Sequence, residues 1–159
     1  MRLGERGSGS LPYLELVRMP AYALQYRLEK SGVLCLVDAF SEVGKVLEPE
    51  DLNSEESDGD FFEPTISRER AHEIGRDLIL RGVLYRRRPA GFSLDAPTSA
   101  VVVQYPYWVY YYRRRNLIDI RVLDAVTGEK TGHKIKLGIL DAFQQQARAE
   151  KDTHGDIGD

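Results

Sequence analysis

The chain has 159 residues, with 22 Lys and Arg against 25 Asp and Glu, which gives a formal net charge of -3 at pH 7. Its hydrophobic content of 42% and its charged content of 30% are typical of a globular protein. The net negative charge argues against general binding to nucleic acid or to anionic membrane, because both depend on an excess of Lys and Arg. Nucleic acid is therefore an unlikely partner.

The ends of the chain differ from its middle. Residues 1–11 are mostly Gly, Ser and charged residues and are predicted to be a disordered tail, as are residues 151–159. Between them we expect a single α+β domain over residues 12–150. No stretch approaches the ~18 apolar residues of a membrane span, and the first residues lack the apolar core of a signal peptide. We therefore expect a cytoplasmic protein without a membrane span.

One pattern of residues occurs twice, at a constant offset of about 86 positions, which indicates an internal duplication. The matched pairs are Pro20 and Pro106, Tyr26 and Tyr112, Asp38 and Asp124, and Ala39 and Ala125. Each copy is predicted to be a β-hairpin, the first over residues 13–47 and the second over residues 100–132. One extra residue is expected in the closing turn of the first copy. The lone Cys35 lies in an apolar run of the first hairpin and is expected to be a buried, inert thiol.

The segment between the hairpins contains an acidic loop and a helix. Residues 48–63 are strongly acidic with few apolar side chains, which is typical of a solvated loop. A helix is predicted over residues 67–82, because Ser67 can cap its start and Gly82 can end it. A C-terminal helix is predicted over residues 134–148, where apolar residues recur every four positions. The elements together predict an α+β fold, an antiparallel sheet of two related hairpins with helices packed on one face.

The second hairpin suggests a family. The run Arg121-Val122-Leu123-Asp124-Ala125-Val126-Thr127-Gly128-Glu129 resembles the closing hairpin of PepSY-like domains, and Ser67-Arg68-Glu69-Arg70-Ala71 is similar to the start of the helix in that family. The resemblance covers roughly residues 66–132, with the related first hairpin at 13–47. It implies a small, loosely cystatin-like α+β domain that binds or regulates and has no catalytic residues. Members of that family are usually exported or attached to membranes.

The most unusual stretch is an aromatic strand that ends in three arginines. Alternation along a strand places Trp108, Tyr110 and Tyr112 on one face and Tyr107 and Tyr111 on the other, so aromatic residues occur on both. The alternatives are a core strand with an exposed rim, a protein interface, a stacking surface for single-stranded nucleic acid, or a site for a sugar or small ligand. The candidate interface residues are Tyr105, Tyr107, Trp108, Tyr110, Tyr112, Arg113, Arg114 and Arg115.

No arrangement of residues indicates an enzyme. Asp38 and Asp124 each lie where a strand enters a turn, and a carboxylate there usually accepts backbone N–H bonds. The alternative is a pair of carboxylates in an active site or a small-ligand site. No metal site and no cofactor are predicted, because no His, Cys or carboxylate cluster has the required spacing. We therefore expect a non-catalytic binding or accessory subunit that contacts another protein or a second copy of itself. A single-stranded nucleic-acid binder is the alternative.

Overall fold

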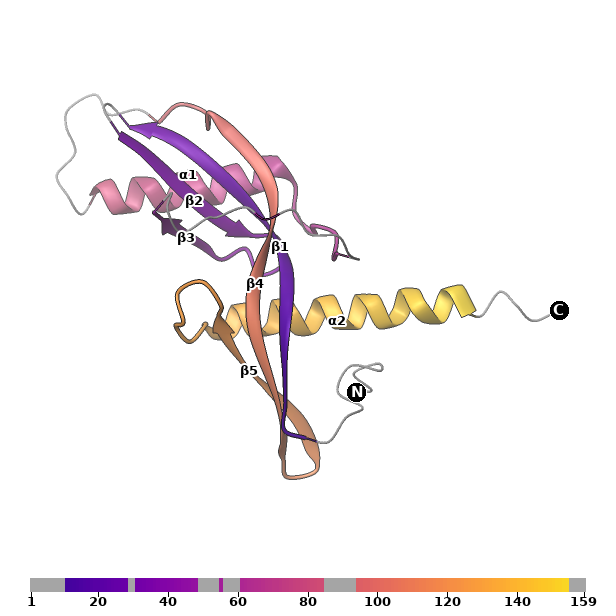
Figure 1. Cartoon of the computed structure of the whole chain (residues 1–159). Helices are drawn as coiled ribbons and strands as arrows, with labels where there is room; N and C mark the ends of the chain where they lie inside the picture. Colours follow the sequence, from indigo (N-terminus) through magenta and orange to yellow (C-terminus); the bar gives the residue numbers. More distant parts are fainter. Residues whose placement is uncertain (1–10, 29–30, 49–54, 56–60, 85–93, 155–159) are drawn as a thin grey trace. The chain divides into compact units, whose positions relative to one another are not determined.

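The computed structural model describes residues 11–28, 31–48, 55, 61–84 and 94–154. The elements in chain order are β1 (Tyr13–Leu28), β2 (Ser31–Asp38), β3 (Gly44–Leu47), α1 (Arg68–Leu84), β4 (Ser99–Arg114), β5 (Leu117–Asp124) and α2 (His133–His154). The strands form a sheet in the order β3-β2-β1-β4-β5 (Figure 1). The α+β class is therefore confirmed. Residues 1–10, most of the predicted acidic loop and residues 155–159 lie outside the described residues.

Residue contacts divide the chain into two compact units, where the sequence predicted one domain. Unit 1 consists of Met1–Met19 and Pro106–Asp159, and unit 2 consists of Pro20–Tyr105. Both divisions fall directly before a proline of the repeat, so β1 and β4 each contribute one end to each unit. Proline has no N–H to donate, but its carbonyl still accepts: Pro20 O accepts from Ala39 N at 2.9 Å, and Pro106 O accepts from Ala125 N at 3.2 Å.

The predicted duplication is confirmed at the level of strand register. The strand β4 begins and ends at the positions equivalent to the ends of β1, and β5 at those equivalent to the ends of β2. The offset is the one that separates Pro106 from Pro20. The pairing is also the same, because Ala21 is opposite Asp38 in the first hairpin and Tyr107 is opposite Asp124 in the second. Both hairpins are antiparallel. Equivalent positions therefore place their side chains on equivalent faces.

The prediction of an extra residue in the first closing turn is wrong. Asp38 N donates to Val43 O and Asp124 N donates to Glu129 O, each at 2.9 Å, so the two turns have the same length. The turn needs one residue with positive φ, which is Gly128 (74°) in the second copy and Glu42 (59°) in the first. The two turns are equivalent although their residue types differ, because a glutamate in the first copy adopts the left-handed conformation that a glycine adopts in the second.

The core of unit 2 lies between the first hairpin and α1. Ser67 Oγ accepts a hydrogen bond from Arg70 N at 3.1 Å, which confirms the predicted cap, and α1 continues past the predicted end at Gly82. Gly75 brings α1 close to the sheet: a Cβ there would lie 3.0 Å from Leu24 Cδ1 and 3.0 Å from Tyr26 Oη. The buried residues of this core are Tyr22, Leu24, Tyr26, Cys35, Val37, Ala39, Ala71 and Ile79.

Unit 1 buries one face of the second hairpin. The buried side chains of this face are Tyr107, Val109, Tyr111, Ile120 and Val122, and α2 buries Ile135, Ile139, Ala142 and Phe143. The helix α2 contacts β5, and because Arg121 and Leu123 on the alternate face of β5 are exposed, α2 lies against the buried face. The helix continues to His154, past the predicted end at residue 148 and into the stretch that was predicted to be a disordered tail. None of the described helices is long and apolar enough to cross a membrane.

We expect Gly75→Ala to leave the protein about 1–3 kcal/mol less stable than Gly82→Ala, because the new methyl group overpacks the contact between α1 and β1 and offsets the gain in helix propensity that both variants share. Gly82→Ala is the matched control in the same helix, since a Cβ there meets nothing within 4 Å. That substitution should stabilise the protein by about 0.5–1 kcal/mol through helix propensity. Urea unfolding of both variants measures the two changes, and equal effects would contradict the close approach at Gly75.

Candidate binding surface

The outward face of the β4–β5 hairpin is aromatic and accessible. Trp108 is 39% exposed and Tyr110 is 38% exposed, and Tyr112 is half-buried. We call the outward side chains of this hairpin the Trp108 face: Trp108, Tyr110 and Tyr112 of β4, and Asp119, Arg121 and Leu123 of β5. Tyr105 and Tyr107 were also predicted to be interface residues. Both are buried, so they form no part of this face.

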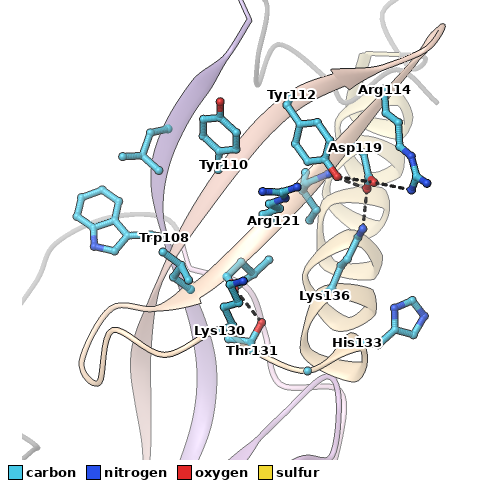
Figure 2. Close-up of a pocket in the computed structure, with 15 residues that line it drawn as sticks. Trp108, Tyr110, Tyr112, Arg114, Asp119, Arg121, Lys130, Thr131, His133 and Lys136 are labelled. Atoms are coloured by element: carbon cyan, nitrogen blue, oxygen red, sulfur yellow. Dashed lines mark hydrogen bonds and ion pairs between the residues drawn. The ribbon is translucent and has the colours of Figure 1, made fainter.

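The Trp108 face forms the floor of a hollow of about 700 Å³ in unit 1 (Figure 2). Leu14 of β1 and residues 130–133, which lead into α2, also line the hollow. Within the floor, the rings of Tyr110 and Tyr112 stack with centroids 6.0 Å apart and planes inclined by 21°. The guanidinium of Arg121 lies 5.2 Å from the centre of the Tyr112 ring. Flat rings and a delocalised cation therefore form the centre of the hollow.

Asp119 is held by a network of donors at the edge of the hollow (Figure 2). Its Oδ1 accepts from Lys136 Nζ at 2.6 Å and from the N–H of Ile120 at 2.8 Å, and its Oδ2 accepts from the Tyr112 hydroxyl at 2.9 Å. The hydrogen bond from Lys136 is the main cause that lowers the pKa of Asp119 to about 2. Partial burial raises this pKa, and the hydrogen bonds from Tyr112 and from the Ile120 N–H lower it further. The carboxylate is therefore ionised and already paired at neutral pH.

The hollow has an excess of positive charge although the whole chain is acidic. Its basic side chains are Arg114, Arg121, Lys130 and Lys136. Asp119 is the only acidic side chain among the described residues that line it, and Lys136 and Arg114 both lie within ion-pair distance of its carboxylate, at 2.6 and 3.9 Å. Charges are thus segregated on the surface, and this face attracts anionic groups.

The two copies of the hairpin use this face differently. Tyr22, Leu24 and Tyr26 of β1 occupy the positions of Trp108, Tyr110 and Tyr112, and in unit 2 they are buried beneath α1. On the partner strand, Val33, Cys35 and Val37 occupy the positions of Asp119, Arg121 and Leu123. In unit 1 the helix α2 lies against the opposite face of the hairpin. The surface that is core in the first copy is therefore open in the second.

The predicted arginines separate into two groups. Arg114 lines the hollow, whereas Arg113 and Arg115 are exposed at the end of the hairpin and do not line it. Asp119, Arg121 and Lys136 were not predicted from the sequence. Arg121 could have been found from the sequence, because side chains alternate along a strand and every second residue of β5 lies on the same face as Trp108, Tyr110 and Tyr112 of β4. The other basic triplet, at residues 86–88, lies outside the described residues.

The two aspartates of the repeat act in turns. Asp38 Oδ1 accepts from the N–H groups of Phe40 and Ser41 at 3.0 and 2.7 Å, and Asp124 Oδ1 accepts from those of Val126 and Thr127 at 2.9 and 3.0 Å. These contacts support the interpretation that both carboxylates stabilise chain reversals. Among the described residues, no group of three or more His, Cys, Asp or Glu side chains is placed to hold a metal ion.

No family model, curated protein or solved structure matches the chain.

We expect Asp119→Asn to lower the free energy of unfolding by about 2 kcal/mol at pH 7, because the folded-state pKa of Asp119 is about 2 against an ordinary value of 3.8. A depressed pKa stabilises the fold above pH 4, and this contribution disappears as the pH falls through about 2. The difference between the wild type and the variant should therefore shrink in acid. Urea unfolding between pH 2 and 7 measures it, and a difference that does not change with pH would contradict the network.

Proposed function

We propose that the protein is a non-catalytic binding module, an accessory subunit that holds a partner protein on the Trp108 face. The observation that supports this most strongly is the contrast between the copies. The equivalent face of the two hairpins is covered by a helix in unit 2 and open in unit 1, and the open version carries three aromatic rings on β4 where the covered one carries two on β1. An exposed aromatic surface of this kind is unfavourable in water unless a partner covers it.

The residue types also fit a protein interface. Trp, Tyr and Arg are the residues that most often dominate the binding energy of protein interfaces, and Trp108, Tyr110 and Arg121 all line this hollow. A non-catalytic role is also what the resemblance to PepSY-like domains implies. The buried free thiol of Cys35 fits a reducing compartment, so we retain the cytoplasm as the proposed location.

Single-stranded nucleic acid is the second candidate. The stacked rings of Tyr110 and Tyr112 beside Arg121 are the arrangement that sequence-independent single-strand binders use. The net charge of -3 works against it, because phosphate binding depends on a wide excess of basic residues. We therefore rank single-stranded nucleic acid below a protein as the proposed partner.

We expect Tyr110→Ala to weaken binding of the partner or self-association by about 1–3 kcal/mol while the fold is retained, because the ring is exposed. Tyr111→Ala, on the buried face of the same strand, should instead destabilise the fold by about 3–5 kcal/mol. Leu137→Ala is the surface control, since Leu137 of α2 is 49% exposed and is not among the residues that line the hollow.

The experiment that tests the proposal is site-specific photo-crosslinking in the cells that make the protein. A photoreactive phenylalanine analogue at position 110 should give a discrete protein adduct, either with a second copy or with another chain, and the same analogue at position 137 should not. Equal crosslinking from both positions, or adducts with nucleic acid from position 110, would overturn the assignment to a protein partner.

A further inference from the structure

We propose that the element seated on the Trp108 face is an amphipathic α-helix of a partner protein, with Asp and Glu along its margin. The inference rests on the proposed function and specifies the shape and charge of the partner. The helix would lie on the second hairpin as α1 lies on the first. The duplication itself shows what this face of the hairpin accepts, because unit 2 contains the filled version of the site.

The filled version shows how a helix fits. Gly75 of α1 crosses the hairpin so closely that a Cβ there would lie 3.0 Å from both Leu24 Cδ1 and Tyr26 Oη. The Cys35 thiol lies 4.0 Å from the carbonyl oxygen of Gly75, and Ala71 and Ile79 complete the buried stripe of the helix. A helix with a small residue at the crossing point, and apolar residues one turn to either side, is therefore the complement of the first hairpin. On the second hairpin, the larger Tyr110 and Arg121 would hold such a helix further from the strands.

The residues that differ between the two hairpins define the charge that the partner helix must carry. Cys35, which lies beneath the backbone of α1, is replaced by Arg121 in the second copy, and Gly44 at the edge is replaced by Lys130. Asp119 replaces Val33 but is already paired with Lys136 at 2.6 Å. A helix that covers this face would bury positive charge without compensation unless it supplied carboxylates. The incoming helix must therefore be acidic at its edges.

The helix of unit 1 does not fill this site. α2 buries its own apolar stripe, which includes Ile135, Ile139 and Phe143, against the other face of the hairpin. Only its first turn reaches the hollow, where Lys136 adds positive charge to the wall. The occupant is therefore a helix that the described residues of unit 1 do not supply.

Peptides with sequences derived from α1 provide the probe. The acidic peptide has the sequence of residues 66–84 with Arg68→Glu, Arg70→Glu, Arg76→Glu and Arg81→Glu, which keeps the apolar stripe and reverses the basic margin. The matched controls are the unchanged α1 peptide, a scrambled peptide with the composition of the acidic one, and a 15-mer of deoxythymidine. Each is labelled and titrated with the full-length protein by fluorescence anisotropy, and peptide helicity is followed by circular dichroism.

We expect the acidic peptide to bind and become helical, at least tenfold more tightly than the unchanged peptide or the scrambled one. Tyr110→Ala should weaken this binding at least tenfold, and Arg121→Glu should reverse the preference between the acidic and unchanged peptides. Arg148→Glu, an exposed charge reversal in α2 outside the hollow, should leave it unchanged. Thermal unfolding of each variant confirms that the fold is retained.

Other outcomes overturn the inference. Equal binding of the acidic and scrambled peptides would mean that the face recognises charge and not a helix. Binding of the oligonucleotide but of neither helical peptide would favour nucleic acid. If no probe binds while crosslinking at position 110 still captures a protein, the helix inference fails and the proposed function stands. If position 110 captures no protein, the proposed function itself fails.

Discussion

A buried aspartate at the end of each hairpin determines which side chains reach the surface. Asp38 and Asp124 are 3% and 5% exposed, and each holds the backbone N–H groups of the turn that follows it. The next residues, Ala39 and Ala125, donate their N–H groups to the carbonyls of Pro20 and Pro106, so each turn helps to hold the register of the strand that enters it. A slip of one residue would exchange the two faces of that strand. Arg121 would then turn towards α2 and Val122 towards solvent. The composition of the Trp108 face therefore depends on a hydrogen-bonded turn at the far end of β5.

The two hairpins show how one backbone supports two uses. In the first copy, small and aliphatic side chains such as Leu24 and Cys35 leave room for the close approach of α1 at Gly75. In the second copy, Tyr110 and Arg121 occupy these positions. The guanidinium of Arg121 remains hydrated beside the stacked rings, whereas the thiol of Cys35 is buried beneath α1. The hydrogen-bonded framework is therefore preserved while the outward side chains change from core to surface types.

The sequence predicted the hairpins, the start of α1 and the class of fold, because these depend on alternation, caps and turns that are local in the chain. It misplaced the gap between the copies, since the left-handed conformation of Glu42 leaves no trace in the residue type. It also left open which face of β4 is exposed. That choice depends on where α2 packs, and the contact from Lys136 to Asp119 joins residues of different elements. Strand periodicity carries no information about such a contact.

An exposed aromatic face has to remain soluble while it has no partner, and the surrounding charges provide this. Arg121 lies over the Tyr112 ring, Lys136 neutralises the charge of Asp119, and the Tyr112 hydroxyl donates a hydrogen bond to the same carboxylate. The same positive charges repel a second face of the same kind, which disfavours the direct stacking of two Trp108 faces. They attract an acidic surface instead. Under the proposed function, the positive charge that remains around Asp119 is the physical reason to propose an acidic partner rather than self-association through this face.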